Sequence, residues 1–149
     1  LLDAAHNADG FRALARHLEG SPIAPRDRML VLGLTSGRRA AHMVEPLREK
    51  VGRILVAEPR TAKAVSADEV CAQLRDEGVE AEAAGRAPEA VSRARALCPP
   101  GGEVVATGSL YLVGDVRAAL TGMDAPIHRG SSDAVPGSAP AKTPRDRRG

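Results

Sequence analysis

The chain has 149 residues, of which 43% are hydrophobic but only 1% aromatic, and its formal net charge is +2. This length indicates one main domain, and the apolar content excludes a wholly disordered chain. Because it has one Phe, one Tyr and no Trp, the chain lacks the aromatic platforms on which RNA-recognition and single-strand-binding modules stack bases.

The basic charge is concentrated near the C-terminus. Residues 129–149 hold five basic and two acidic side chains, a net charge of +3, so residues 1–128 carry −1. The main domain therefore gives no electrostatic reason to expect a nucleic-acid partner. With no apolar run of membrane-spanning length and no secretory signal, we expect no membrane partner and a cytoplasmic location.

The two cysteines, Cys71 and Cys98, are far apart in the sequence. Neither belongs to a CxxC or Cys/His pattern with the spacing of a zinc site. We expect two buried free thiols in a reducing compartment rather than a disulfide or a metal site.

Strand and helix patterns alternate along the chain. The opening Leu1-Leu2-Asp3 is typical of the end of a strand, and we expect the beginning of that strand to lie in a preceding segment. Helical spacing of apolar residues predicts helices, over residues 9–19, 40–47, 66–74, 87–97 and 110–120. Continuous or alternating apolar runs predict strands, over residues 29–34, 53–57, 79–83 and 103–107. Pro46 is expected to kink or shorten the second helix.

Five strand–helix units in succession predict an α/β fold. We expect a doubly wound, Rossmann-like and mostly parallel sheet with helices on both faces, in a domain that covers residues 1–127. Residues 128–149 are rich in Ser, Pro, Gly, Ala and Arg, and this composition predicts a disordered basic tail.

Two polar clusters follow predicted strands. Such sheets bind ligands beyond the carboxyl ends of their strands. Asp3, His6 and Asn7 lie at the first of these corners, and Gly108 and Ser109 follow the strand over residues 103–107. A carboxylate, an imidazole and a hydroxyl can bind ribose hydroxyls, carboxylates or phosphates. From spacing alone, helix capping by these side chains is slightly favoured.

Other motifs of catalytic sites are absent from the sequence. It contains no GxGxxG, GxSxG or HExxH pattern. Residues 137–143 superficially resemble a P-loop, but Pro136 stands in place of the first Gly, and Ala141 stands where a Gly must precede the Lys. The arginines of Ser36-Gly37-Arg38-Arg39 can meet a phosphate or lie on a solvated helix start. No complete catalytic site is visible in this chain.

Two segments carry a resemblance to a known family. Leu1-Leu2-Asp3-Ala4-Ala5-His6-Asn7 resembles the Asp-Gly-Ala-His-Asn-Pro motif that opens the C-terminal domain of folylpolyglutamate synthase/dihydrofolate synthase, in the Mur ligase family. Thr107-Gly108-Ser109-Leu110-Tyr111-Leu112-Val113-Gly114-Asp115-Val116-Arg117 is similar to the motif that closes that domain, and is the more specific of the two. Residues 31–34 and 58–64 also resemble it, so the likeness extends from residue 1 to about residue 120.

The resemblance implies a ligase in which ATP phosphorylates a substrate carboxylate and the amine of L-glutamate displaces the phosphate. The acceptor is dihydropteroate, a folate or both. By motif, Asp3 would contact the ATP ribose, while His6 and Ser109 would hold the incoming glutamate; Asn7 is a lesser candidate. The ligands of Mg²⁺, the P-loop and the pterin site would lie in an N-terminal ATPase domain that this chain lacks. We expect a monomer, and we expect the chain alone to be inactive.

Three departures from the family pattern accompany the resemblance. Ala4 replaces a Gly, Ala8 replaces a Pro, and residues 36–39 stand where many relatives carry an Asp-Lys-Asp stretch. The last departure bears on which substrate is taken. Two alternatives stay open: a stand-alone, non-catalytic Rossmann-like binding or regulatory module, and a Mur-type ligase with another acceptor.

Overall fold

The computed structural model describes residues 1–122. Its centre is a sheet of four parallel strands in the order β3-β2-β1-β4. The strands are β1 (Arg28–Leu32), β2 (Arg53–Glu58), β3 (Glu82–Arg86) and β4 (Glu103–Thr107). The helices are α1 (Ala8–Glu19), α2 (Ala40–Val44), α3 (Ala67–Asp76), α4 (Ala87–Leu97) and α5 (Leu110–Thr121), with short 3₁₀ turns at Pro25–Asp27 and Glu45–Leu47. The predicted tail, residues 128–149, lies outside the described residues.

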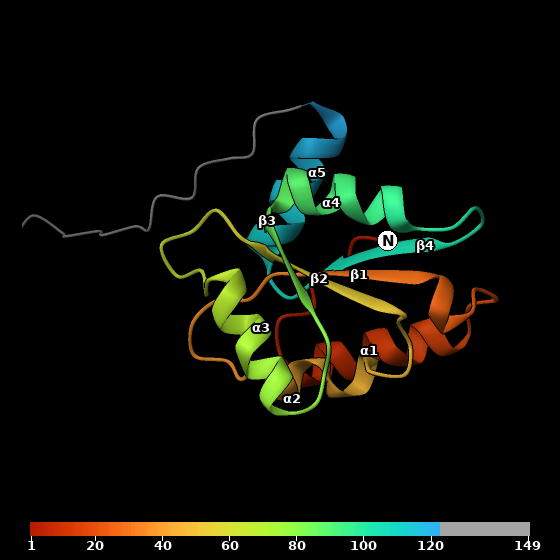
Figure 1. The fold of residues 1–149 in the computed structure, drawn as a ribbon, viewed down its shortest axis with the longest axis horizontal. Coiled ribbons are helices and arrows are strands. Elements are labelled where there is room, and N and C mark those ends of the chain that lie inside the picture. Colours follow the sequence, from red (N-terminus) through yellow and green to blue (C-terminus); the bar gives the residue numbers. More distant parts are fainter. Residues whose placement is uncertain (123–149) are drawn as a thin grey trace, which may run out of the picture.

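Helices cover both faces of the sheet. In Figure 1, α1, α2 and α3 lie below the sheet, and α4 and α5 lie above it. Alternate residues of β1 supply the two cores: Leu30 and Leu32 pack with α1, α2 and α3, whereas Met29 and Val31 pack with α4 and α5. This two-sided burial explains why β1 is a continuous apolar run. The predicted doubly wound α/β fold is confirmed.

Local sequence signals set several helix boundaries. Helix α3 begins after Ser66, whose Oγ accepts a hydrogen bond from the Glu69 N–H at 3.2 Å. The regular helix α2 ends at Val44, and Pro46 lies in the 3₁₀ turn that follows. Pro88 lies in the first turn of α4. Proline lacks an N–H and is tolerated only where a helix leaves that donor unpaired.

Two strand predictions differ from the structure. The predicted strand over residues 79–83 is wrong in its bounds, because β3 begins at Glu82, opposite Leu55. Val79 instead packs in the core, and its N–H donates to Leu74 O at 2.9 Å, which closes the end of α3. The predicted first strand is reduced to one parallel bridge between Leu2 and Ala106. The described sheet therefore has four strands rather than five.

Both cysteines are free thiols. Cys71 is buried on α3, and Cys98 is half-buried after α4. The prediction of free thiols is confirmed, although only Cys71 is fully buried.

Candidate functional site

The two predicted polar clusters meet at the carboxyl edge of the sheet. The carbonyl of Ala5 accepts hydrogen bonds from the Gly108 N–H at 3.1 Å and from Thr107 Oγ1 at 3.4 Å. The N–H of Asp3 donates to Ala106 O at 3.0 Å, so the N-terminal segment runs alongside β4. These contacts join the corner over residues 3–7 to the β4–α5 corner.

Within the N-terminal corner, each polar side chain makes a local contact. Asp3 Oδ1 accepts from the Ala5 N–H at 2.7 Å and closes a tight turn. Asn7 is the N-cap of α1, and its Oδ1 accepts from the Gly10 N–H at 2.8 Å. His6 is exposed, with Nδ1 2.9 Å from Ala4 O. Because a carbonyl only accepts, that contact requires the proton on Nδ1 and makes Nε2 an acceptor in the neutral ring.

The β4–α5 corner depends on a glycine. Gly108 has φ +114°, and a Cβ there would lie 2.6 Å from the carbonyl oxygen of Gly33. The next residue, Ser109, is the N-cap of α5; its Oγ accepts from the Leu112 N–H at 3.1 Å. Ser109 is only 3% exposed. Capping uses an acceptor site of the hydroxyl and leaves its O–H as a donor, so capping and ligand binding are compatible.

The loops after β1 and β2, residues 34–39 and 59–65, are joined to each other and are called the paired loops below. Thr35 and Ala64 form an antiparallel bridge, and the Ser36 N–H donates to Lys63 O at 2.7 Å. The N–H of Arg60 donates to the buried carboxylate of Asp115 on α5 at 2.8 Å. The paired loops are thus fixed to each other and to α5.

Sequence reasoning missed the role of Asp115. It noted this residue only as part of the closing motif. A signal was present, because Asp115 is the one acidic residue of the otherwise largely apolar α5. A buried carboxylate requires a hydrogen-bond partner, which the loop after β2 supplies.

Two hollows of the surface lie away from the two joined corners. One of about 600 Å³ is lined by residues around Arg53, Val79 and Glu82, where β2 and β3 begin. Another of about 500 Å³ lies between α4, α5 and the N-terminal segment, with Leu2 and Leu120 in its lining. Asp3, His6 and Ser109 line neither hollow.

The described residues contain neither a cluster of metal ligands nor a membrane-spanning helix. Within residues 1–122, no three or more His, Cys, Asp or Glu side chains are grouped to hold a metal ion. No helix in that range has the length and apolar character needed to cross a bilayer.

Solved structures with the same fold include three folate-related ligases. The bifunctional folylpolyglutamate synthase/dihydrofolate synthase of Yersinia pestis CO92 is 26% identical, with a TM-score of 0.69 over 81% of this chain and 28% of its own. Mycobacterium tuberculosis folylpolyglutamate synthase complexed with ADP is 21% identical, with a TM-score of 0.70 over 83% of this chain and 30% of its own. E. coli FolC in complex with DHPP and ADP is 19% identical, with a TM-score of 0.72 over 80% of this chain and 28% of its own. This chain therefore spans less than a third of each relative.

A family model described as Mur ligase, glutamate ligase domain, matches residues 1–110. No curated protein matches the chain. The family match covers most of the chain, including both corners and the paired loops. The chain thus belongs to the Mur ligase family as a glutamate ligase domain, and it resembles the corresponding part of folylpolyglutamate synthase/dihydrofolate synthase.

Proposed function

We propose that this chain is the C-terminal domain of an ATP-dependent ligase that adds L-glutamate to dihydropteroate, to folates or to both, through an acyl phosphate. The junction of the two corners carries the proposal, because it brings the segment of Asp3 and His6 against that of Ser109. A related structure from Yersinia pestis, 27% identical over 81% of this chain, has Mn, AMPPNP and L-glutamate bound. Family membership supports the same reaction class.

Each side chain suits one part of this task. Asp3 uses Oδ1 in its own turn, so Oδ2 is left to accept from the ribose hydroxyls of ATP. The Ser109 O–H donates a hydrogen bond to a carboxylate of the incoming glutamate, and His6 donates one from Nε2 in the protonated form of its ring, because Nδ1 is bonded to Ala4 O. Asn7 already caps α1, so its role stays secondary. The chain's own contribution is positioning, which by itself supplies a large part of the acceleration in reactions between bound partners.

The residues present account for only part of a nucleotide site. Residues 1–122 offer an acceptor for ribose but no grouped metal ligands, and the sequence has no intact P-loop. We therefore assign the triphosphate and Mg²⁺ to an N-terminal ATPase domain, where the metal would neutralise the transferring phosphoryl group. The chain alone is expected to be inactive, and the boundary of its domain at residue 127 stays a prediction.

The test is ADP release by the full-length gene product that contains this chain. It is given ATP, Mg²⁺, L-glutamate and either dihydropteroate or tetrahydrofolate. We expect acceptor- and glutamate-dependent turnover, and a loss of about 100-fold in the Asp3→Ala/His6→Ala double variant, since misplaced substrates cost about that much. The matched control is Asp76→Ala/His17→Ala, which removes the same side-chain types from the far ends of α3 and α1.

Three results would contradict parts of the proposal. Turnover that survives the Asp3→Ala/His6→Ala change would reduce these residues to local turn contacts. An absence of turnover with both acceptors would favour a Mur-type ligase with another acceptor, or a non-catalytic binding module. Glutamate-dependent ATP turnover by this chain alone would contradict the assignment of the triphosphate site to another domain.

A further inference from the structure

Thr107 is a buried polar residue at the junction of the two corners. It is the last residue of β4, and its side chain is fully buried. Valine has the same branched shape, with a methyl group where threonine has its hydroxyl, and it suits a buried strand equally well. Because burial of a hydroxyl costs free energy unless the group is hydrogen-bonded, the Thr107 hydroxyl requires a specific partner.

That partner is the carbonyl of Ala5, in the N-terminal corner. Thr107 Oγ1 donates to Ala5 O at 3.4 Å, although the two residues are 102 positions apart in the sequence. The N–H of Gly108 donates to the same oxygen at 3.1 Å. A carbonyl oxygen has two lone pairs and can accept both bonds. One side chain and one main-chain group of the β4–α5 corner therefore hold a single atom of the N-terminal corner.

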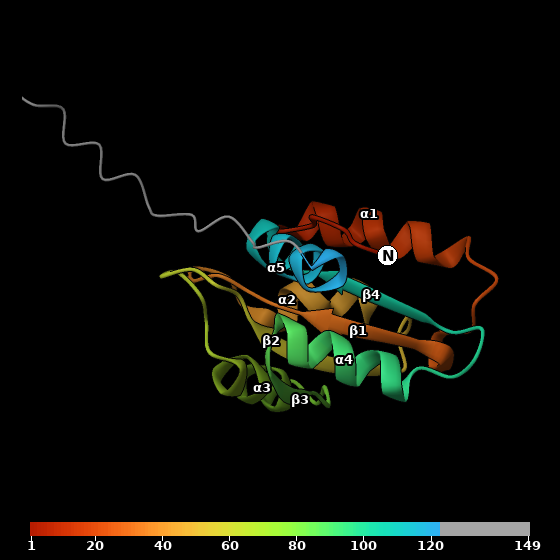
Figure 2. The same ribbon diagram turned by 90° about the horizontal axis from the view of Figure 1, so that it is seen from above.

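The backbone of Thr107 is fixed by the sheet. Its carbonyl accepts a hydrogen bond from the Gly33 N–H at 3.1 Å, and Thr107 is paired with Leu32 in the ladder between β1 and β4. Figure 2 shows the N-terminal end of the chain beside β4. The sheet is thus the fixed part of the junction, and the N-terminal corner is the part that the hydroxyl positions.

Ala5 connects this contact to the polar side chains of the N-terminal corner. Its N–H donates to Asp3 Oδ1 at 2.7 Å, and His6 follows it directly in the chain. On the side of α1, a Cβ on Gly10 would lie 3.1 Å from the Ala5 Cα, so the first turn of that helix approaches the Ala5 backbone closely. A displacement of Ala5 would therefore move Asp3 and His6 together, relative to the β4–α5 corner.

We propose that Thr107 is a positioning residue, whose hydroxyl sets the separation of His6 from Ser109 and thereby the fit of the incoming L-glutamate. This inference rests on the proposed function and adds to it a residue that does not touch the substrate. In that function glutamate is held from both corners, whereas ATP meets only Asp3 in this chain. Loss of the hydroxyl should therefore weaken the binding of glutamate more than the binding of ATP.

Two substitutions separate the hydrogen bond of Thr107 from its packing. Thr107→Val keeps the branched shape and removes only the hydroxyl, while Thr107→Ser keeps the hydroxyl and removes a methyl group. A hydroxyl with a purely structural role would change the free energy of unfolding and leave KM for glutamate unaltered, as long as the domain stays folded. A positioning hydroxyl changes that KM in Thr107→Val and preserves it in Thr107→Ser.

The kinetic test uses the full-length protein and the acceptor that supports its turnover. We expect Thr107→Val to raise KM for L-glutamate roughly fivefold, the factor that one neutral hydrogen bond contributes. KM for ATP and kcat should stay within twofold of wild type, and Thr107→Ser should return KM for glutamate to within twofold. The matched control is Thr121→Val, which removes a hydroxyl that donates to Arg117 O at 2.9 Å at the exposed end of α5. It should alter neither KM.

Hydrogen exchange in this chain alone tests the junction without the ligase reaction. The amides of Asp3 and Gly108 donate across the junction, to Ala106 O and Ala5 O. We expect both amides to exchange roughly fivefold faster in Thr107→Val, because one of the bonds that close the junction is lost. Thr107→Ser should exchange at the wild-type rate, and amides within β2 should change less than twofold in either variant.

The two tests distinguish failure of the inference from failure of the proposed function. In an active enzyme, an unchanged KM for glutamate in Thr107→Val would overturn the inference and leave the ligase intact. Equal rises in KM for glutamate and for ATP, or a Thr107→Ser variant as impaired as Thr107→Val, would also overturn it. If the full-length protein is inactive, faster exchange confined to the junction of Thr107→Val would refute the ligase and support Thr107 as the residue that positions the N-terminal corner.

Discussion

The two ends of the parallel sheet are held together by different kinds of contact. At the amino end, the centre is a buried cation, Arg28, which is 1% exposed at the start of β1. At the carboxyl end, main-chain hydrogen bonds and close-packed glycines join the segments, and the cations lie outside on the paired loops. The amino end therefore buries its central charge, whereas the charged side chains at the carboxyl end lie at the surface.

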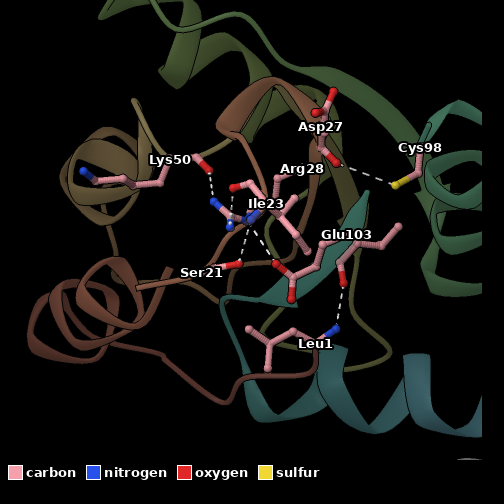
Figure 3. A network of polar contacts seen from close by, with 9 residues as sticks. Leu1, Ser21, Ile23, Asp27, Arg28, Lys50, Cys98 and Glu103 are labelled. Atoms are coloured by element: carbon pink, nitrogen blue, oxygen red, sulfur yellow. Dashed lines mark hydrogen bonds and ion pairs between the residues drawn. The ribbon is translucent and has the colours of Figure 1, made fainter. Parts of the chain in front are cut away.

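Arg28 connects three separate segments at the amino end. Its Nε lies 3.0 Å from Glu103 on β4, Nη1 donates to Lys50 O at 2.7 Å, and Nη2 donates to Ile23 O at 3.1 Å (Figure 3). All three guanidinium nitrogens therefore have partners, which a buried arginine requires. The geometry fixes the loops before β1 and β2 against β4.

At the carboxyl end, backbone segments lie close together because the residues at the contact points are glycines, which have no side chain. The N–H of Gly108 reaches Ala5 O, and a Cβ on Gly33 would meet Pro59 and Leu112 at 3.0 Å. This arrangement brings backbone segments together and leaves polar side chains at the rim. The amino end is thus ordered around a buried charge, whereas the carboxyl end holds polar side chains on loops, which is where rigid scaffolds usually carry function.

The largest effect is expected from Arg28→Ala. This change leaves Glu103 and the carbonyls of Lys50 and Ile23 without their partner, so the free energy of unfolding should fall by about 3 to 5 kcal/mol. Urea unfolding followed by circular dichroism measures it. The control is Arg53→Ala, because Arg53 pairs with Glu82 at the surface and its loss should cost about 1 kcal/mol or less. Equal losses of unfolding free energy in the two variants would show that Arg28 stabilises the domain no more than a surface arginine does.

The corresponding change at the carboxyl end is Gly108→Ala. Because φ is +114° and the new Cβ would lie 2.6 Å from Gly33 O, we expect a loss of about 3 kcal/mol. Gly114→Ala is the matched control, since Gly114 lies within α5 and an added Cβ has no neighbour within 4 Å. That variant should gain about 0.5 to 1 kcal/mol, because alanine is the better helix former. Similar midpoints of urea unfolding in both variants would show that the corner tolerates a side chain.

Most strands and helices of the domain could be predicted because the sequence signals that define them are local. The apolar run of β1, the proline that shortens α2 and the Ser66 cap each act within a few residues. The two polar corners were also predicted, because parallel strands end at one edge and the resemblance drew attention to their motifs. In the structure Asn7 and Ser109 both cap helices, so the capping indicated by local spacing is confirmed.

What the sequence did not reveal depends on contacts between distant residues. Arg28 and Glu103 are 75 positions apart, and Asp115 and Arg60 are 55 apart. Neither pair has a periodicity that a single sequence displays. The start of β3 was misplaced because Val79 is apolar like a strand residue, yet it closes α3, and only the pairing with β2 distinguishes these roles.

Asp115→Ala tests how the paired loops are held. The change removes the acceptor of the Arg60 N–H, and we expect a moderate loss of about 1 to 3 kcal/mol, as for other hydrogen bonds to charged groups. Hydrogen exchange should accelerate most at the Arg60 amide and far less in β1. Asp115→Asn keeps an oxygen acceptor and should retain most of the protection. Uniformly faster exchange throughout the domain would instead mean that Asp115 stabilises the whole core rather than the paired loops.

The smallest effect is expected at Cys71, which lies on α3 away from both ends of the sheet. Burial raises the pKa of the Cys71 thiol above its usual value of 9.0, and the nearby Asp68 carboxylate acts in the same direction. Above pH 9.0 the unfolded chain loses this proton first, so the thiol's contribution to stability is complete below pH 9.0 and declines as pH rises towards the folded pKa. Relative to wild type, Cys71→Ala should therefore cost less at pH 10 than at pH 7. Val70→Ala, which opens a cavity on the same helix without removing a titrating group, should cost the same at both values. A Cys71→Ala cost that does not change between pH 7 and pH 10 would show that the thiolate is tolerated as well in the folded domain as in water.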